Sequence, residues 1–241
     1  MDLGVLEGDS VAHSLRLLST VYNYNHWIFE TLRDHIGPRV LEVGAGVGNI
    51  TQFLLNQEEV TCLEPVDPYR LHLLQKFRKH LNVTVYPYPI EQTPNEEVKE
   101  GRFDCVLCIN VLEHIADDRG ALCRMRRLAG PGGRVVVFVP GLPCIYGRMD
   151  KAMGHCRRYT LRSLRRMFHE VGLRPEQGRY MNMIGAPAWW WQGRVRKKQK
   201  LSVAATLAFD RLLPFLSALE RLLPVPFGQS VYLVGTNVSN G

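Results

Sequence analysis

The stretch Val40-Leu41-Glu42-Val43-Gly44-Ala45-Gly46-Val47-Gly48-Asn49-Ile50-Thr51 decides the fold of this 241-residue chain. The apolar run 39–43 predicts a buried β-strand, and the three glycines at alternate positions predict a tight turn after it. Glycine lacks a Cβ atom, so the backbone can turn sharply there and lie against a ligand. The pattern therefore predicts a nucleotide-binding turn at the first strand of an α/β domain.

The spacing of this turn, Glu-x-Gly-x-Gly-x-Gly, differs from the Gly-x-Gly-x-x-Gly of dinucleotide-binding turns. It lacks the register that presents a helix N-terminus to a pyrophosphate. The carboxylate of Glu42 would also repel a pyrophosphate, whereas it suits a cationic cofactor tail. The turn therefore argues against an NAD-dependent oxidoreductase.

Strand and helix patterns alternate along the rest of the chain. Further strands are expected at 60–65, 82–86, 102–110, within 128–140, at 173–181 and at 229–236. Helices are expected at 10–36, from 49 to 56, at 69–81, at 117–129 and at 161–170, the last with Thr160 as its N-cap and Gly172 at its end. Such alternation is typical of an α/β domain, and the length suits one domain with an elaboration.

Polar residues follow two of the expected strands. Glu64 stands sixteen residues after Gly48, where a carboxylate can accept hydrogen bonds from both hydroxyls of a ribose. The segment 110–115, Asn-Val-Leu-Glu-His-Ile, follows the strand at 102–110. Because ligands of such folds bind beyond the carboxyl ends of parallel strands, this segment is expected at the floor of the site.

These segments resemble a known family. Residues 42–48 resemble motif I of the class I S-adenosylmethionine (SAM) methyltransferases, and 110–115 resembles motif IV of one large branch of them. The glycine turn 128–133 also resembles the family, and 154–160, Gly-His-Cys-Arg-Arg-Tyr-Thr, is similar to a string in a bacterial subgroup. The resemblance covers most of the chain and implies a SAM-dependent methyltransferase.

The resemblance also implies an architecture. The expected fold is α/β, a Rossmann-like, doubly wound seven-stranded sheet with an antiparallel last strand. The expected parts are an N-terminal helical cap (1–38), a SAM-binding core (39–181), a helical insertion or lid (182–228) and the last strand of the core (229–241).

By the same resemblance, SAM is the cofactor and S-adenosylhomocysteine its product. Glu42 and the backbone of 44–48 are expected to hold the methionine end, and Glu64 the ribose. Ile90 and the backbone of 110–111 are expected to border the adenine and the sulfonium. The expected cofactor-binding residues are Glu42, Gly44, Ala45, Gly46, Gly48, Asn49, Glu64, Pro65, Ile90, Asn110 and Val111.

Two segments rich in aromatic and ionisable residues, 22–27 and 155–159, are candidates for binding the methyl acceptor, with packing against the sheet as the alternative. The expected substrate-binding residues are Tyr22, Tyr24, Trp27, Arg157, Arg158 and Tyr159. A hydroxyl or protonated amine acceptor needs a base, and the catalytic candidates are His155, His114 and His26. The histidines are scattered in the sequence without ligand spacing, so no metal is predicted.

Net charge is +7, and residues 148–200 hold fourteen Lys or Arg against three acidic residues. Three tryptophans at 189–191 precede the basic run 194–200 and an apolar segment, 201–223, which Pro214 is expected to break into a helical pair. Peripheral membrane contact through 189–223, an acceptor pocket, and packing or homodimer contact all remain open. No Asn/Asp-Pro-Pro-Tyr/Phe string follows the fourth strand, so nucleic acid is not an expected partner.

The N-terminal sequence lacks a basic region followed by an apolar run, so no signal peptide is expected, and a cytoplasmic location is predicted. Cys105 and Cys108 lie in an expected strand and should point to opposite faces as reduced thiols. The predicted function is methyl transfer to O, N or C of a small molecule in secondary or specialised metabolism. The alternatives are a lipid-linked or saccharide acceptor at a membrane surface, and a non-catalytic SAM-fold binding protein.

Overall fold

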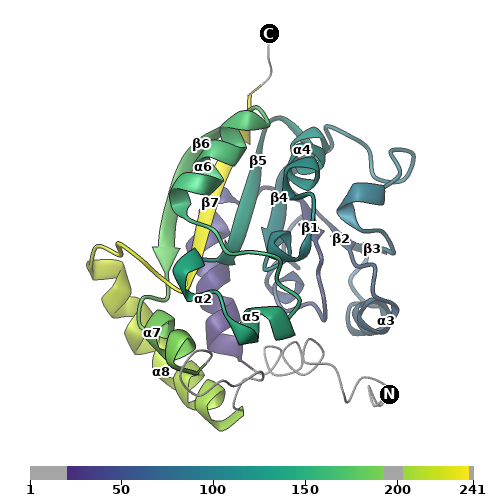
Figure 1. Ribbon diagram of the computed structural model, residues 1–241. Helices are drawn as coiled ribbons and strands as arrows, with labels where there is room; N and C mark the ends of the chain where they lie inside the picture. The colour runs from purple at the N-terminus through teal and green to yellow at the C-terminus, as the bar shows by residue number, and fades with distance from the viewer. Residues whose placement is uncertain (1–20, 193–202, 239–241) are drawn as a thin grey trace.

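The computed structural model of this chain describes residues 21–192 and 203–238. Its sheet has the strand order β3-β2-β1-β4-β5-β7-β6, and β7 runs antiparallel to its neighbours β5 and β6. The strands are β1 (Arg39–Val43), β2 (Glu59–Leu63), β3 (Val83–Tyr86), β4 (Phe103–Ile109), β5 (Ala129–Pro140), β6 (Leu173–Met181) and β7 (Ser230–Asn237). The predicted seven-stranded Rossmann-like sheet with an antiparallel last strand is confirmed (Figure 1).

Helices cover both faces of the sheet because its strands are apolar on both sides. On β5, Val135 and Val137 pack into one core cluster with α4 (Asp118–Leu128) and α6 (Leu161–Glu170). The alternate residues Val136 and Phe138 pack into a second cluster with α2 (Tyr22–Leu32) and α3 (Asp67–Lys76). This alternation follows from the two-residue period of a strand.

The prediction for the two cysteines of β4 is confirmed. Cys108 belongs to the first core cluster and Cys105 to the second, and both are free and buried. The predicted cap of α6 is confirmed as well, because the Thr160 hydroxyl accepts a hydrogen bond from the Ser163 backbone N–H at 3.0 Å.

The predicted helix at 49–56 is wrong. The segment between β1 and β2 holds only a single 3-10 turn, η3 (Thr51–Phe53). Gly46 and Gly48 adopt φ values of +57° and +77°, which a right-handed helix cannot include. Since β2 already begins at Glu59, little chain remains for a full helix.

The predicted break at Pro214 is also wrong. The insertion before β7 contains α7 (Gly185–Trp190) and one long helix, α8 (Val203–Leu222), which continues through Pro214. Proline removes the N–H that would bond to the carbonyl of Asp210 four residues earlier. That carbonyl instead accepts a hydrogen bond from Asn23 Nδ2 at 3.1 Å, which replaces the missing partner.

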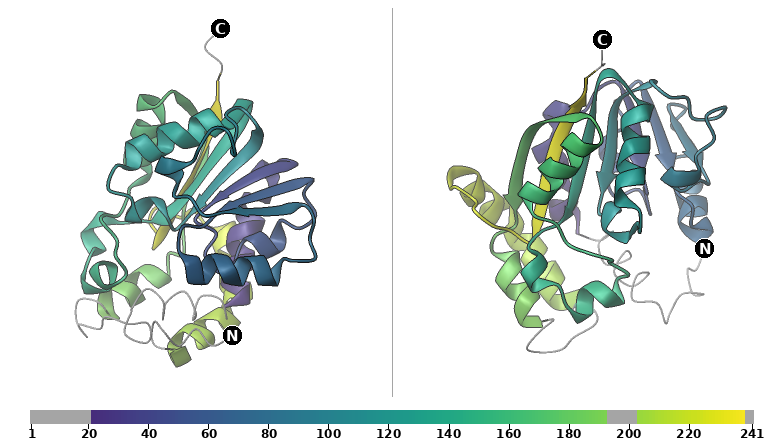
Figure 2. Two further views of the ribbon diagram at one scale, coloured as in Figure 1. Left: turned by 90° about the vertical axis from the view of Figure 1, so that its right-hand side faces the viewer. Right: turned by 45° about the horizontal axis from the view of Figure 1, so that its top comes forward.

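The insertion packs against the N-terminal part of the chain. Asp210 of α8 accepts hydrogen bonds from the backbone N–H groups of Tyr24 (2.9 Å) and Asn23 (3.4 Å) at the start of α2. Of the helix predicted at 10–36, α2 and the 3-10 turn η2 (Arg33–His35) are described, and residues 10–20 lie outside the described residues. Figures 1 and 2 show α7 and α8 at one end of the sheet, and Figure 1 shows α2 behind the sheet.

The remaining short elements are η4 (Ile90–Gln92), η5 (Leu112–His114), η6 (Pro143–Ile145) and α5 (Arg148–Ala152). Both η5 and α5 follow the carboxyl end of a parallel strand, β4 and β5 respectively, and lie at the end of the sheet that α7 and α8 also occupy (Figure 1). Within residues 21–192 and 203–238, no helix combines the length and apolar character needed to cross a bilayer.

Candidate active site

A cavity of about 670 Å³ lies at the carboxyl ends of β1, β2 and β4. Gly44 and Gly46 line it from the turn after β1, and Glu64 from the end of β2. Trp189 of α7 and Phe209 of α8 line it from the insertion. The cavity therefore has one wall from the sheet and one wall from the lid-like helices.

Steric constraints require glycine at two positions of the turn after β1. Gly44 has φ +66°, and a Cβ atom there would lie 2.5 Å from Val111 Cγ2, which itself lines the cavity. At Gly48, with φ +77°, a Cβ atom would lie 2.5 Å from the Phe77 ring. Only glycine fits both constraints, so the backbone can pass close to Val111 and to the Phe77 ring.

Glu64 fixes the turn from the next strand. Its Oε2 accepts a hydrogen bond from Gly46 N–H at 2.7 Å, and its Oε1 accepts one from Val66 N–H at 2.9 Å. Burial raises the pKa of this carboxyl, and the two backbone hydrogen bonds offset part of that rise. The carboxylate lines the cavity with acceptor capacity left for the hydroxyls of a ribose.

Glu42 lies beneath the turn instead of lining the cavity. Its Oε2 accepts a hydrogen bond from Thr51 Oγ1 at 2.7 Å. Burial raises the pKa of Glu42 to about 7, and the Thr51 hydrogen bond lowers it in part. In this structure Glu42 supports the turn through Thr51, and its contact with the methionine end of SAM stays a prediction.

The structure gathers seven of the eleven predicted cofactor residues around the cavity. These are Gly44, Gly46, Glu64, Pro65, Ile90, Asn110 and Val111. The other four, Glu42, Ala45, Gly48 and Asn49, belong to the same turn but are not among the lining residues. Asn110 adopts φ +55°, a conformation that asparagine tolerates better than most residues, and its N–H bonds to the Phe138 carbonyl at 2.8 Å.

The loop after α5 brings His155 into the cavity wall with a carboxylate behind it. The His155 Nδ1 lies 3.1 Å from Asp150 Oδ1, and Arg158 Nε donates to the same oxygen at 2.7 Å. Gly147 N–H and Trp189 Nε1 donate to the other oxygen at 2.9 and 3.4 Å. Burial raises the pKa of Asp150, but the hydrogen bonds from His155 and Arg158 outweigh it and hold the pKa below its usual value.

An ionised carboxylate only accepts hydrogen bonds, so the His155 nitrogen that faces it, Nδ1, carries a proton. The Nε2 atom then has a free lone pair. His155 is 7% exposed and lines the cavity, so this lone pair is held in place rather than solvated. The arrangement suits either a general base or a metal ligand.

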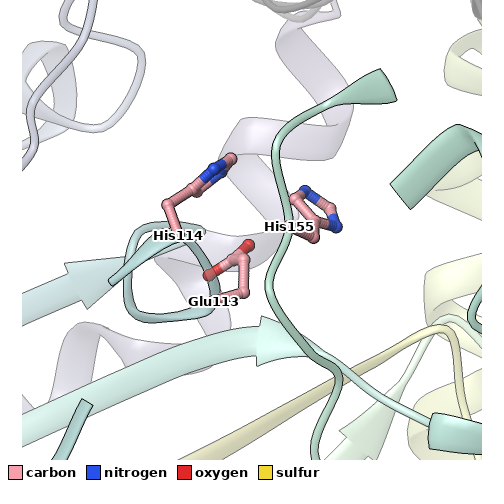
Figure 3. Close-up of side chains that lie close together, drawn as sticks. All are labelled: Glu113, His114 and His155. Atoms are coloured by element: carbon pink, nitrogen blue, oxygen red, sulfur yellow. The ribbon is translucent and has the colours of Figure 1, made fainter. Parts of the chain in front are cut away.

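Glu113 and His114 lie beside His155 (Figure 3). The rings of His114 and His155 meet edge to face with centroids 4.9 Å apart. Burial raises the pKa of Glu113 to about 8. Desolvation, and then the neighbouring His155, lower the pKa of His114 to about 4, although part of the residue remains exposed.

His114 and His155, which lie far apart in the sequence, are therefore neighbours in the fold. His114 follows β4 and His155 follows α5, and the fold brings these two segments together at the end of the sheet. The Cys156 N–H to Glu113 carbonyl hydrogen bond, 2.7 Å long, ties them directly. A separation of 41 residues in the sequence hides this contact.

The predicted acceptor residues divide into two groups. Tyr24 and Arg158 line the cavity. Arg157 and Tyr159 instead contact Asp118, at 2.7 and 2.9 Å, and anchor the loop to α4. The structure does not bring them to the cavity.

The remaining predicted residues of α2 also lie outside the cavity lining. Trp27 is buried in the second core cluster. Tyr22 and the catalytic candidate His26 stack on each other, with centroids 5.6 Å apart, on an exposed face. A role in the reaction for these three residues stays a prediction that the placement does not support.

Sequence reasoning missed two residues of the site. Glu113 stands in the quoted segment 110–115, and its acidic side chain next to a histidine was the available signal. Asp150 carries no such signal, because its partners His155, Arg158 and Trp189 come together only in the fold.

The fold and this cavity define a class I SAM-dependent methyltransferase. A family model described as a methyltransferase domain matches residues 22–177, and the chain belongs to that family. The cofactor of the protein is therefore SAM, and the glycine turn with Glu64 remains its predicted site at the ends of β1 and β2.

Curated relatives match this chain only in part. The ubiquinone biosynthesis O-methyltransferase of Erwinia tasmaniensis is 31% identical over 116 residues, which are 45% of this chain and 45% of that protein. The highly reducing polyketide synthase stpks1 of Strobilurus tenacellus is 30% identical over 108 residues, 41% of this chain and 4% of that protein. The chain spans less than half the length of these relatives.

Solved structures share the fold at low identity. A geranyl diphosphate methyltransferase in complex with SAM has a TM-score of 0.66 at 16% identity, covering 96% of this chain and 92% of that chain. A Burkholderia thailandensis 1,6-didemethyltoxoflavin-N1-methyltransferase with bound S-adenosylhomocysteine has a TM-score of 0.60 at 16% identity, covering 92% and 80%. These likenesses establish the fold.

Proposed function

We propose that this methyltransferase transfers the methyl group of SAM to an oxygen atom of a small, largely apolar acceptor, and that the acceptor loses its proton at His155. The observation that carries the proposal is the placement of His155, backed by Asp150, in the same cavity as the glycine turn and Glu64. The O-methyltransferase relative supports oxygen as the nucleophile. A role in specialised metabolism stays a prediction.

The two walls of the cavity suit the two substrates. Glu64 and the backbone of Gly44 and Gly46 offer polar contacts for the cofactor. Trp189, Phe209 and Leu213 offer an apolar surface for the acceptor. SAM supplies a methyl group on a good leaving group, so the protein mainly has to align the nucleophile and exclude water.

The His155 Nε2 lone pair is the feature that handles the proton. Asp150 fixes the orientation of the ring and keeps the proton on Nδ1, which leaves Nε2 directed away from the carboxylate. Removing a positioned base lowers the rate by about 10²–10⁴-fold.

The test uses labelled SAM and a panel of phenols, alcohols and amines. His155→Ala should lower turnover with the best acceptor at least about 100-fold, while the affinity for S-adenosylhomocysteine stays unchanged. The matched control is His169→Ala, an exposed histidine of α6. Full turnover by His155→Ala would remove the assignment, and a panel in which only amines react would remove the oxygen nucleophile.

A second candidate is a lipid-linked acceptor presented at an anionic membrane surface. The outer face of α8 exposes an apolar stripe, Leu212, Phe215, Leu219 and Leu222, which are 59%, 73%, 43% and 83% exposed. On this helix Arg211 and Arg221 are exposed, whereas Asp210 is buried and Glu220 is occupied by the N–H groups of Asn182 and Met183. Apolar residues flanked by basic ones favour an anionic bilayer over a second copy of this cationic chain.

Co-sedimentation with phosphatidylserine vesicles tests this candidate. Phe215→Glu should reduce the bound fraction, because it places a negative charge in the apolar stripe. Leu81→Glu is the matched control, since Leu81 is 99% exposed and lies after α3. Equal binding by the wild type and Phe215→Glu, or a dimer that Phe215→Glu dissociates, would contradict the membrane candidate.

A further inference from the structure

We propose that Glu113, His114 and His155 bind a divalent transition-metal ion of the Zn²⁺ class, which activates the acceptor hydroxyl. This inference rests on the proposed function, because it concerns the same site. It keeps the methyl transfer to oxygen but replaces the base role of His155: the His155 lone pair holds the ion, and the proton of the ion-bound hydroxyl goes to solvent.

The three side chains converge on one point of the cavity wall. One potential ligand atom of each residue lies within 4.8 Å of the other two, and Figure 3 shows the Glu113 carboxylate and both rings grouped together. Two imidazoles and one carboxylate are a ligand set that catalytic zinc sites use, with a further position left for substrate. All three residues line the cavity, so that further position would face the acceptor.

The Glu113 carboxylate is the strongest evidence for a missing cationic partner. It is 0% exposed, and within the described part of the chain neither of its oxygens has a hydrogen-bond partner. Buried carboxylates are normally paired or coordinate a metal. The nearby Arg158 guanidinium does not fill this role, because it donates to Asp150 and to the Gly141 carbonyl.

Asp150 supplies the outer contact that a metal-binding histidine usually has. His155 Nδ1 faces its carboxylate at 3.1 Å, which leaves Nε2 as the ligand atom. Arg158 and Trp189 hold Asp150 in place. Arg158 pairs with Asp150, which leaves the Glu113 carboxyl as the group for which, among the described residues, a bound cation would be the partner. A base role for His155 alone leaves the buried Glu113 unexplained.

The chemistry balances without a further reactant. An acceptor hydroxyl that binds the ion loses its proton to solvent more readily, because the ion stabilises the oxyanion. The oxyanion attacks the methyl carbon of SAM. The carbon–sulfur bond breaks, and its electron pair stays on sulfur to give neutral S-adenosylhomocysteine and the methyl ether.

The experiment measures metal binding directly. Tag-free protein is treated with a chelator and desalted. It is then titrated with Zn²⁺ against a chromophoric chelator, and with Co²⁺ while the visible absorption is followed. We expect one ion per chain.

The variants test the ligand assignment. Glu113→Gln and His155→Ala should each weaken metal binding by at least about 10-fold, and Asp150→Asn by about 10–100-fold. The control His169→Ala should bind as the wild type does, and retained S-adenosylhomocysteine binding shows that each variant is folded.

Three results would contradict the metal site, and each has a different meaning. Equal affinity in the wild type and Glu113→Gln means an adventitious ion only, and Mg²⁺ binding more tightly than Zn²⁺ removes the transition-metal assignment. Chelator-treated wild type should lose turnover and regain it with Zn²⁺. Full turnover without metal, abolished by His155→Ala, would overturn the metal site but leave the proposed function with His155 as the base.

Discussion

Alanine substitutions at Gly44 and Gly101 distinguish the effect of backbone strain from the effect of a steric clash. Gly44 and Gly101 have similar φ values, +66° and +72°, so alanine at either position costs about 1–2 kcal/mol of backbone strain. A Cβ atom at Gly44 would collide with Val111 at 2.5 Å, whereas at Gly101 no atom of the described residues would lie within 4 Å of it. Gly44→Ala should therefore weaken S-adenosylhomocysteine binding at least about tenfold in calorimetric titration, a difference of about 1.4 kcal/mol. Gly101→Ala should lose stability but keep the affinity, and equal losses of affinity would contradict this account.

Glu42 should make stability depend on pH. Burial raises its pKa in the folded protein from 4.5 to about 7, so the folded state holds this proton more tightly than the unfolded state. The contribution of this group is complete below pH 4.5 and is lost as pH rises through 7, which amounts to about 3 kcal/mol. Glu42→Gln cannot lose the proton, so its stability relative to wild type should rise over that interval. Urea unfolding at pH 4 and pH 8 measures the difference, and the exposed Glu96→Gln should show no such trend.

At the scale of elements, Asp210 joins α8 to α2. Its carboxylate accepts hydrogen bonds from the first N–H groups of α2, the position that an N-cap side chain normally serves. Asp210→Ala leaves these donors unpaired and should lower the free energy of unfolding by about 1–3 kcal/mol. Faster hydrogen exchange confined to 22–32 and 203–222 should accompany the loss. The neighbouring, exposed Arg211→Ala should change neither measurement, and an equal effect from it would show that the carboxylate is not the cause.

The strands were predictable because their signal is local. Apolar runs indicated six of the strands, whereas β6 is largely polar, although it begins and ends at the predicted residues. The helix at 49–56 was mispredicted for a local reason, the glycine conformations before it and the short segment before β2, whereas the break at Pro214 was mispredicted because of a distant contact. Gly46 and Gly48 adopt left-handed conformations, and Asn23 supplies the hydrogen bond that Pro214 removes.

The candidate site also contains residues that the sequence indicates and residues that it does not indicate. The polar residues at the ends of β1, β2 and β4 belong to short motifs, and most of them line the cavity. Arg157 and Tyr159 stand in such a motif too, yet Asp118 holds both of them away from the cavity. Asp150 owes its position to three residues from three segments, so a linear pattern cannot indicate it.

At the scale of the whole molecule, the cavity connects the sheet to α2, α7 and α8, since all of these line it. A ligand that binds only the folded state stabilises every element that it bridges. S-adenosylhomocysteine at 100 times its Kd should add about 2.7 kcal/mol to the free energy of unfolding. For a chain of this length that corresponds to a rise in Tm of about 5–10 °C.

The shape of the thermal unfolding transition tests whether the helices α7 and α8 unfold together with the core. In a Trp27→Phe variant, whose fluorescence comes from Trp189–Trp191 because the core tryptophan is removed, a single transition by circular dichroism and by fluorescence is expected, shifted as a whole by the ligand. Gly44→Ala should show about half of this shift or less at the same concentration, because a tenfold weaker affinity leaves about 1.4 kcal/mol of stabilisation. An early tryptophan transition that the ligand does not move would mean that α7 and α8 unfold independently, and that the cofactor contacts only the wall formed by the sheet.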